Sequence, residues 1–213
     1  MTRLPGCFQT LPLRERLFVR ARLASAPLEV MAALAPEGRI ADVGCGHGAL
    51  SALLLERGRR VVGIDVDAAK IAWARRGPGQ VPGAEFAVES LEALAARAAG
   101  QFDAVVIADV LYLVPPARWP DFLTLVRALL RPGGELLLKE AENDGSWRAR
   151  KALWQEWLMV RALRRTASSG AMGFRPRQEL EQALDLAGFS RLSTRSLARG
   201  YSTPHVLFHA RCG

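Results

Sequence analysis

The chain is poor in cysteine, lysine and tyrosine, and it contains no long uninterrupted hydrophobic run. Its three cysteines, Cys7, Cys45 and Cys212, are scattered along 213 residues. This distribution argues against a disulfide framework and against a zinc-binding spacing, and it is typical of a reducing compartment. Arginine or glutamate interrupts every apolar stretch before it reaches the roughly 18 residues of a membrane span. We therefore predict a cytoplasmic protein with no metal site, and with no signal peptide because no apolar core precedes a small-residue cleavage site.

Lysine is scarce although the net charge is +8, since only three of the 29 basic residues are lysine. An arginine- and alanine-rich, lysine-poor composition also arises from codon bias in a GC-rich genome, whatever the function. The arginines are spread along the chain and are not massed in one tract. The charge therefore favours an anionic small molecule or a membrane surface over a nucleic-acid partner.

The length and the 50% hydrophobic content suit one α/β domain, spanning residues 1–213, whose sheet is covered on both faces. Residues 11–35 carry apolar positions at helical spacing, and Pro27 divides them into two pieces. We expect residues 1–37 to form a helical cover over the ligand site. Strands alternate with helices from Ile40 to Glu140, and the expected helices span 48–57, 68–76, 90–99 and 117–130. This alternation predicts a parallel sheet with right-handed crossovers and a ligand at the carboxyl ends of its strands.

The most informative stretch is residues 40–48, an apolar strand that runs into three alternating glycines, Gly44, Gly46 and Gly48. Glycine permits a sharp turn and a close backbone approach to a ligand. Asp65 ends the next expected strand, 60–65, about 20 residues further on, where an acid accepts hydrogen bonds from ribose hydroxyls. Because the loop also satisfies a loose dinucleotide fingerprint, a nicotinamide cofactor stays open on these residues alone.

Later segments favour one nucleoside cofactor. The third expected strand ends at Glu89-Ser90, the fourth covers 102–112, residues 130–134 form a turn, and the fifth strand covers 135–140. Together with the glycine loop, Asp65, Asp109-Val-Leu-Tyr112 and Arg131-Pro-Gly-Gly134, this pattern resembles the class I S-adenosylmethionine-dependent methyltransferases over residues 38–140. Two departures are Glu89 in place of the commoner aspartate and the absence of an Asn/Asp-Pro-Pro-aromatic motif. The second departure argues against the branch that methylates amino groups of nucleobases or glutamine.

The resemblance implies a three-layer, Rossmann-like sheet of seven strands, mostly parallel with an antiparallel last strand, with N-terminal helices and a helical insertion after the fifth strand. It implies S-adenosyl-L-methionine as cofactor and S-adenosyl-L-homocysteine as product. The residues that it assigns to the cofactor lie in the glycine loop and at the ends of the second, third and fourth strands: Asp42, Gly44, Cys45, Gly46, His47, Gly48, Asp65, Val66, Glu89, Ser90, Asp109 and Val110.

Residues 142–187 are longer than a simple crossover requires. Tryptophans, among them Trp147, alternate there with arginines at helical spacing, which predicts a basic amphipathic helix. Such a helix either buries its tryptophan face on the sheet, closes as a lid over a hydrophobic substrate, or rests on a membrane. We expect a lid or substrate insertion in 142–187.

Candidate catalytic residues are His205, Glu140 and Lys139. His205 opens the last strand at the ligand end of the sheet and could act as a base, although it could equally order the turn after Pro204. Lys139 and Glu140 end an otherwise apolar strand, where they could serve the acceptor or simply pair with each other or with Asp109. Aromatic residues that could stack on a flat substrate are Tyr112, Trp147 and Tyr201.

We therefore expect methyl transfer to oxygen or carbon of a small, hydrophobic or phenolic acceptor. Stretches around Arg20–Leu28, Lys139-Glu140 and Pro204–Phe208 resemble bacterial methyltransferases of secondary metabolism, of the aryl-polyene pigment type. The alternatives are an RNA methyltransferase and a non-catalytic protein that binds S-adenosylmethionine.

Overall fold

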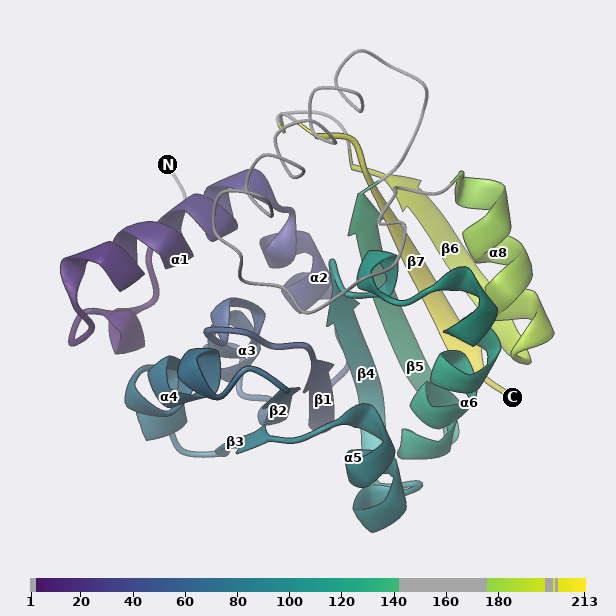
Figure 1. The fold of residues 1–213 in the computed structure, drawn as a ribbon, viewed down its shortest axis with the longest axis horizontal. Helices are drawn as coiled ribbons and strands as arrows, with labels where there is room; N and C mark the ends of the chain where they lie inside the picture. Colours follow the sequence, from purple (N-terminus) through teal and green to yellow (C-terminus); the bar gives the residue numbers. More distant parts are fainter. Residues whose placement is uncertain (1–2, 142–175, 198–200, 202) are drawn as a thin grey trace.

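The structure, a computed structural model, describes residues 3–141, 176–197, 201 and 203–213. Its centre is a seven-stranded sheet in the order β3-β2-β1-β4-β5-β7-β6 (Figure 1). All neighbouring strands pair in parallel except β7, which is antiparallel to both β5 and β6. The predicted fold class is confirmed. The strands are β1 (Arg39–Val43), β2 (Arg60–Asp65), β3 (Ala84–Val88), β4 (Phe102–Ala108), β5 (Leu130–Ala141), β6 (Phe189–Ser196) and β7 (His205–Cys212).

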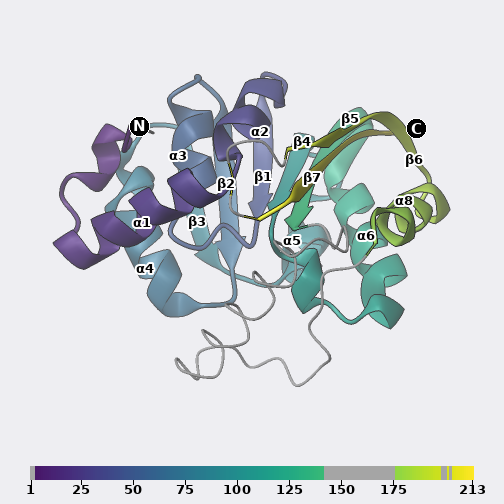
Figure 2. The same ribbon diagram turned by 90° about the horizontal axis from the view of Figure 1, so that it is seen from above.

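Helices cover both faces of the sheet (Figures 1 and 2). One face packs against α1 (Leu13–Ser25), α2 (Leu28–Leu34) and α3 (Ala49–Leu55), with α4 (Ala68–Arg76) beside β3. The other face packs against α5 (Leu91–Ala98), α6 (Trp119–Leu129) and α8 (Arg177–Leu186). Short 3-10 turns connect these elements, namely η1 (Gly6–Phe8), η2 (Pro78–Gln80), η3 (Leu111–Leu113) and η4 (Pro116–Arg118). No helix among the described ranges is long and apolar enough to cross a membrane.

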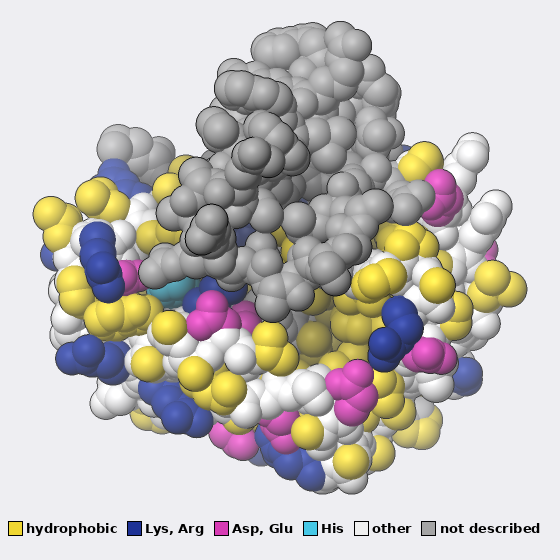
Figure 3. Space-filling model, viewed as in Figure 1, with side chains coloured by type: hydrophobic (Ala, Val, Ile, Leu, Met, Phe, Trp, Pro, Cys, Tyr) yellow, Lys and Arg dark blue, Asp and Glu magenta, His cyan; other side chains and the backbone are white. Residues whose placement is uncertain are grey.

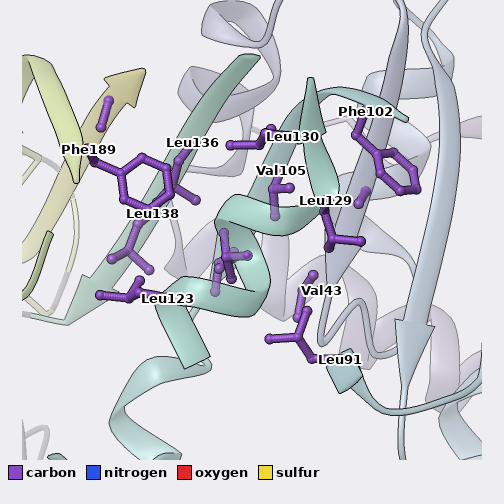
Figure 4. Packing of buried hydrophobic residues seen from close by; sticks show 14 of the residues in the cluster. Val43, Leu91, Phe102, Val105, Leu123, Leu129, Leu130, Leu136, Leu138 and Phe189 are labelled. Atoms are coloured by element: carbon purple, nitrogen blue, oxygen red, sulfur yellow. The ribbon is translucent and has the colours of Figure 1, made fainter. Parts of the chain in front are cut away.

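Alternation along the strands divides the apolar residues between two cores, because successive strand side chains point to opposite faces. Leu136 and Leu138 of β5 lie in the core under α5, α6 and α8, while Leu137 between them lies in the core under α1–α3. Figure 4 shows Leu136 and Leu138 together with Leu123 and Leu129 of α6. A strand of this kind reads as continuously apolar, which is typical of a sheet buried on both sides.

Two strand boundaries differ by several residues from the sequence-based expectation, and one expected segment lies largely outside the described residues. Strand β4 ends at Ala108 and not at 112, because Asp109 takes a left-handed backbone (φ 58°) and residues 111–113 form η3. Strand β5 begins at Leu130, which pairs with Phe102, so the expected turn 130–134 is an irregular start of the strand. Of the expected insertion 142–187, residues 142–175, including Trp147, lie outside the described residues.

Candidate functional site

A cavity of about 760 Å³ lies where the carboxyl ends of β1, β2 and β4 meet α1. It is the place where an open parallel sheet offers its loops to a ligand. Every residue that the sequence assigned to the cofactor lines this cavity except Gly48. The assigned residues on its wall are Asp42, Gly44, Cys45, Gly46, His47, Asp65, Val66, Glu89, Ser90, Asp109 and Val110.

The glycine loop is fixed against its neighbours by close backbone packing. Backbone N–H groups of Gly44 and Cys45 donate to the Ile64 carbonyl at 2.8 and 3.0 Å. A Cβ on Gly44 would lie 2.4 Å from Cγ2 of Val110, and the residue has φ +73°. At Gly46 an added Cβ meets no protein atom closer than 3.8 Å. The missing side chain of Gly44 therefore allows Val110 to pack closely against the glycine loop, whereas the backbone of Gly46 borders the open cavity.

Asp65 joins the glycine loop to the end of β2. One carboxylate oxygen accepts the Gly46 N–H at 3.0 Å, and the other accepts the Asp67 N–H at 2.9 Å. Each carboxylate oxygen has a second lone pair. The side chain is thus held in place by the backbone while it keeps acceptor capacity for a pair of hydroxyl donors in the cavity.

Asp42 lies deeper, at the end of β1. It is buried, and its carboxylate accepts the Ser51 hydroxyl at 2.6 Å. Burial raises the pKa of Asp42 from 3.8 to about 6, against the effect of the Ser51 hydrogen bond. The residue therefore ties the start of α3 to β1 beneath the cavity.

Glu89 and Ser90 both have structural partners at the cavity rim. Glu89 accepts two hydrogen bonds from the Arg97 guanidinium, each 2.8 Å long. The Ser90 hydroxyl accepts the Ala93 N–H at 3.3 Å and caps α5. Such a bidentate pair orients the Glu89 carboxylate, which leaves it available to a ligand amino group in a fixed position.

Asp109 lies between two cations at the end of β4. Nζ of Lys139 contacts its two oxygens at 2.5 and 2.6 Å, and the Arg22 guanidinium approaches at 2.6 Å. Burial alone would raise the pKa of Asp109, but the charges of Lys139 and Arg22 outweigh it and hold the pKa below its ordinary value. Asp109 and Arg22 line the cavity, whereas the Lys139 side chain is fully buried and does not line it. This position fits the sequence-based alternative that Lys139 is a counter-ion.

Glu140 supports the segment that follows Asp109. Its Oε1 accepts the N–H groups of Val110 and Leu111 at 3.0 and 2.7 Å. Its Oε2 is buried and has no hydrogen-bond partner within the described residues. Burial, followed by the Asp109 charge, raises the pKa of Glu140 from 4.5 to about 8. Burial thus favours the neutral form of the carboxyl group, which does not line the cavity.

Helix α1 is fastened to the glycine loop. Nε2 of His47 lies 3.0 Å from Oε2 of Glu15, and the rings of His47 and Phe18 are 4.6 Å apart. Burial lowers the pKa of His47, while the hydrogen bond to Glu15 opposes the shift. His47 thus contacts the helix that covers the cavity, a partner that its place in the loop did not reveal.

The other end of α1 is fastened to the start of β7. Nε2–H of His205 donates to the Ser25 carbonyl at 3.0 Å, which assigns the proton to Nε2 because a carbonyl only accepts. Nδ1 is buried without a partner in the described part of the chain. Burial, with Lys139 next, lowers the pKa of His205 to about 4, so the ring is neutral at pH 7. His205 and Tyr201, whose rings meet edge-on at 5.6 Å, do not line the cavity, whereas Tyr112 does.

Three residues of α1 that lie at or beside the cavity were not predicted from the sequence, namely Glu15, Phe18 and Arg22. Phe18 and Arg22 line the cavity, and Glu15 holds His47. Each partner lies far along the chain, so no local spacing marks these residues. The available signal was the helical spacing of apolar residues in 11–35, ahead of the first strand.

Comparison with known proteins identifies the family of this chain. A family model described as a methyltransferase domain matches residues 14–194. A ubiquinone biosynthesis O-methyltransferase of Xanthomonas axonopodis pv. citri is 40% identical over 132 residues, which cover 60% of this chain and 51% of that protein. The chain thus spans about half the length of the curated relatives it matches.

Solved structures agree in fold. A methyltransferase from Methanosarcina mazei, described as S-adenosylmethionine-dependent, has a TM-score of 0.66 and 26% identity, covering 88% of this chain and 97% of that one. The 1,6-didemethyltoxoflavin N1-methyltransferase of Burkholderia thailandensis has a TM-score of 0.70 and 19% identity, covering 93% and 82%. The chain belongs to the methyltransferase domain family. The predicted resemblance to class I S-adenosylmethionine-dependent methyltransferases is thereby confirmed.

S-adenosylmethionine is the cofactor that this cavity has to accommodate, and the residues fit it. Asp65 keeps acceptor capacity where ribose hydroxyls require it, and Gly46 leaves backbone space beside it. Arg22 offers a guanidinium to a carboxylate, and the acids Asp65, Glu89 and Asp109 suit a ligand with hydroxyl, amino and sulfonium groups.

Proposed function

We propose that the protein transfers a methyl group from S-adenosylmethionine to oxygen or carbon of a small, hydrophobic or phenolic acceptor. The observation that carries this proposal is the apolar part of the cavity wall. Phe18 of α1, Leu113 of η3 and Phe122 of α6 line the same cavity as the cofactor residues but belong to none of the cofactor motifs. The volume of about 760 Å³ lies in the upper half of the range for ligand pockets, about 300–1,000 Å³, which supports a second molecule beside the cofactor.

The bound cofactor supplies an activated methyl group on a sulfonium. The chain has to align the acceptor with that group and exclude water. Helix α1 is fastened at both ends over the cavity, at His47 and at His205, and so provides a cover. The curated relatives are named as O-methyltransferases, which favours an oxygen nucleophile.

The three candidate catalytic residues take different parts in this proposal. Lys139 keeps Asp109 ionised at the cavity wall, and Glu140 fixes the backbone of the adjoining segment, so both act as positioning residues. His205 has an Nδ1 without a partner in the described residues, but its pKa, lowered to about 4, makes the ring a weak base, and the residue does not line the cavity. Its role as a base stays a prediction, as do the aryl-polyene type of acceptor and the substrate contacts of Tyr112, Trp147 and Tyr201.

The test is methyl transfer from cofactor with an isotopically labelled methyl group to three matched acceptors, analysed by mass spectrometry. The acceptors are an alkyl-substituted catechol, the same compound with both hydroxyls already methylated, and an alkylated aniline. We expect label on the catechol alone. Label on the aniline alone, or on no acceptor while RNA in the same mixture is labelled, would contradict the proposal.

A pair of variants on α6 locates the acceptor. Phe122→Ala should raise KM for the catechol about tenfold or more and leave cofactor affinity unchanged, since it removes apolar surface from the cavity wall. The control is Leu125→Ala on the same helix, because the Leu125 side chain packs against the core and does not line the cavity. Equal KM values for the two variants would place the acceptor elsewhere.

A further inference from the structure

The outward face of α1 is apolar although it faces solvent. Leu13 and Leu17 are 66% and 56% exposed, and they lie on one helical face with Ala21 and Ala24, because residues three or four apart in a helix are neighbours. The opposite face is buried and includes Val19. An amphipathic surface helix normally exposes its polar side. Helix α1 therefore has apolar residues on both faces.

The charges that border this outward face are all positive. Arg14 and Arg20 are exposed beside it. The one acidic residue of α1 is Glu15, which is buried; its Oε2 lies 3.0 Å from Nε2 of His47, and its Oε1 pairs with Nε of Arg14 at 2.7 Å. Figure 3 shows hydrophobic and basic side chains next to each other, with an acidic side chain beside the basic ones, at the end of the molecule where Figure 1 draws α1. An apolar strip flanked by arginine, with no exposed acid on the helix itself, is the pattern of a helix that lies in the interface of an anionic membrane.

The same helix forms part of the cavity wall. Phe18 is 50% exposed and also lines the cavity, together with Val19 and Arg22 of the same helix. The outward face of α1 is thus separated from the cavity by one half-exposed aromatic ring. A molecule that leaves an apolar surface under α1 would enter the cavity past Phe18.

We propose that the outward face of α1 (Leu13, Arg14, Leu17, Arg20, Ala21 and Ala24) docks on an anionic lipid bilayer, and that the acceptor enters the cavity from that bilayer past Phe18. Charge complementarity favours lipid over a second copy of the chain. A two-fold contact through this face would bring its own arginines together with no exposed acid on α1 to pair with them. The docking stands on the surface alone, while the entry of the acceptor rests on the proposed function.

The docking is tested by co-sedimentation of the full chain with vesicles. One set is phosphatidylcholine alone, and the other contains roughly one third phosphatidylglycerol, an anionic lipid. We expect binding to the anionic vesicles and at least about tenfold weaker partitioning of the double variant Leu13→Gln/Leu17→Gln. Arg20→Gln should weaken partitioning about fivefold, the value of one basic residue near an anionic surface.

Matched controls lie on other elements. Leu186→Gln changes a leucine of α8 that is 87% exposed, and Arg118→Gln changes an exposed arginine of η4. Both should partition as the wild type does. The proposal is wrong if the wild type ignores anionic vesicles, if the controls weaken binding as much as the α1 variants, or if Leu13→Gln/Leu17→Gln dissolves a dimer without changing vesicle binding.

A second readout separates the surface from the proposed function. With the alkylated catechol dissolved in anionic vesicles, Leu13→Gln/Leu17→Gln should raise KM, whereas with a short, water-soluble catechol it should leave KM unchanged. If no catechol is methylated while vesicle binding still depends on Leu13 and Leu17, the proposed acceptor is wrong and the docking surface stands. Equal KM effects for both acceptors would refute delivery from the bilayer.

Discussion

Replacing Glu140 with glutamine should stabilise the protein at neutral pH. The side chain is 2% exposed, and burial followed by the charge of Asp109 raises its pKa from 4.5 to about 8. Between these values the folded state keeps a proton that the unfolded state releases. Stability that is fully present below pH 4.5 is therefore lost as the pH rises, by about 1.4 kcal/mol per unit. Glutamine keeps an Oε1 that can accept from Val110 and Leu111, and it does not titrate.

The magnitude follows from that slope. The free energy of unfolding of Glu140→Gln, relative to that of the wild type, should therefore increase by about 3 kcal/mol between pH 4.5 and pH 7. The assay is urea denaturation followed by tryptophan fluorescence across this pH range. Taking the difference between variant and wild type removes the contributions of other titrating groups.

Glu135 on the same strand is the matched control, since its pKa is shifted in the opposite direction. Burial raises its pKa, but hydrogen bonds from His209 and Arg211 outweigh burial and lower it below 4.5. Glu135→Gln should therefore lose stability above that pH. If the difference between Glu140→Gln and the wild type stays constant from pH 4.5 to about 8, Glu140 is ionised in the folded protein and the reasoning fails.

Three further predictions concern the loop, the base and the charge. Gly44→Ala should destabilise the protein more than Gly100→Ala in urea denaturation. Both glycines have a positive φ, but only the methyl group at position 44 would lie 2.4 Å from Cγ2 of Val110, so the double variant Gly44→Ala/Val110→Ala should recover part of the lost stability. His205→Ala should lower turnover about 10²–10⁴-fold at nearly unchanged cofactor affinity, with partial recovery at high pH for a phenolic acceptor; unchanged turnover would leave His205 as a donor to the Ser25 carbonyl. Binding to a random RNA oligomer should be weak and collapse between low and moderate salt, and tight binding at physiological salt would promote the RNA methyltransferase alternative.

Elements with strong local signals could be predicted from the sequence. Helix α4 spans Ala68–Arg76, as expected, because the Asp67 side chain caps its first turn and a glycine follows its last residue. The parallel sheet from Ile40 to Glu140 was also predictable, and the resemblance to the methyltransferase family implied the antiparallel last strand. Parallel strands joined by helices leave few topologies, and the glycine loop marks the first strand.

Contacts between distant segments could not be predicted in this way. The end of β4 at Ala108 depends on the left-handed Asp109, which is held by Lys139 and Arg22, while the local sequence continues as an apolar run. Arg22 and Glu15 gain their roles only when α1 folds over the strand ends. Composition and periodicity describe one segment at a time, so they identified α1 as a helix without its partners.

The central claim is that the cavity beyond β1 and β2 binds S-adenosylmethionine through Asp65. Titration calorimetry of the wild type with S-adenosylhomocysteine and with NAD tests it most directly. The account predicts saturable binding of S-adenosylhomocysteine, no binding of NAD, and affinity about tenfold or more weaker in Asp65→Ala, since ribose hydroxyls lose their acceptor at a cost of about 1–3 kcal/mol. Asp121→Ala, an exposed acid on α6, should bind as the wild type does. Saturable binding of NAD together with no binding of S-adenosylhomocysteine would contradict the account.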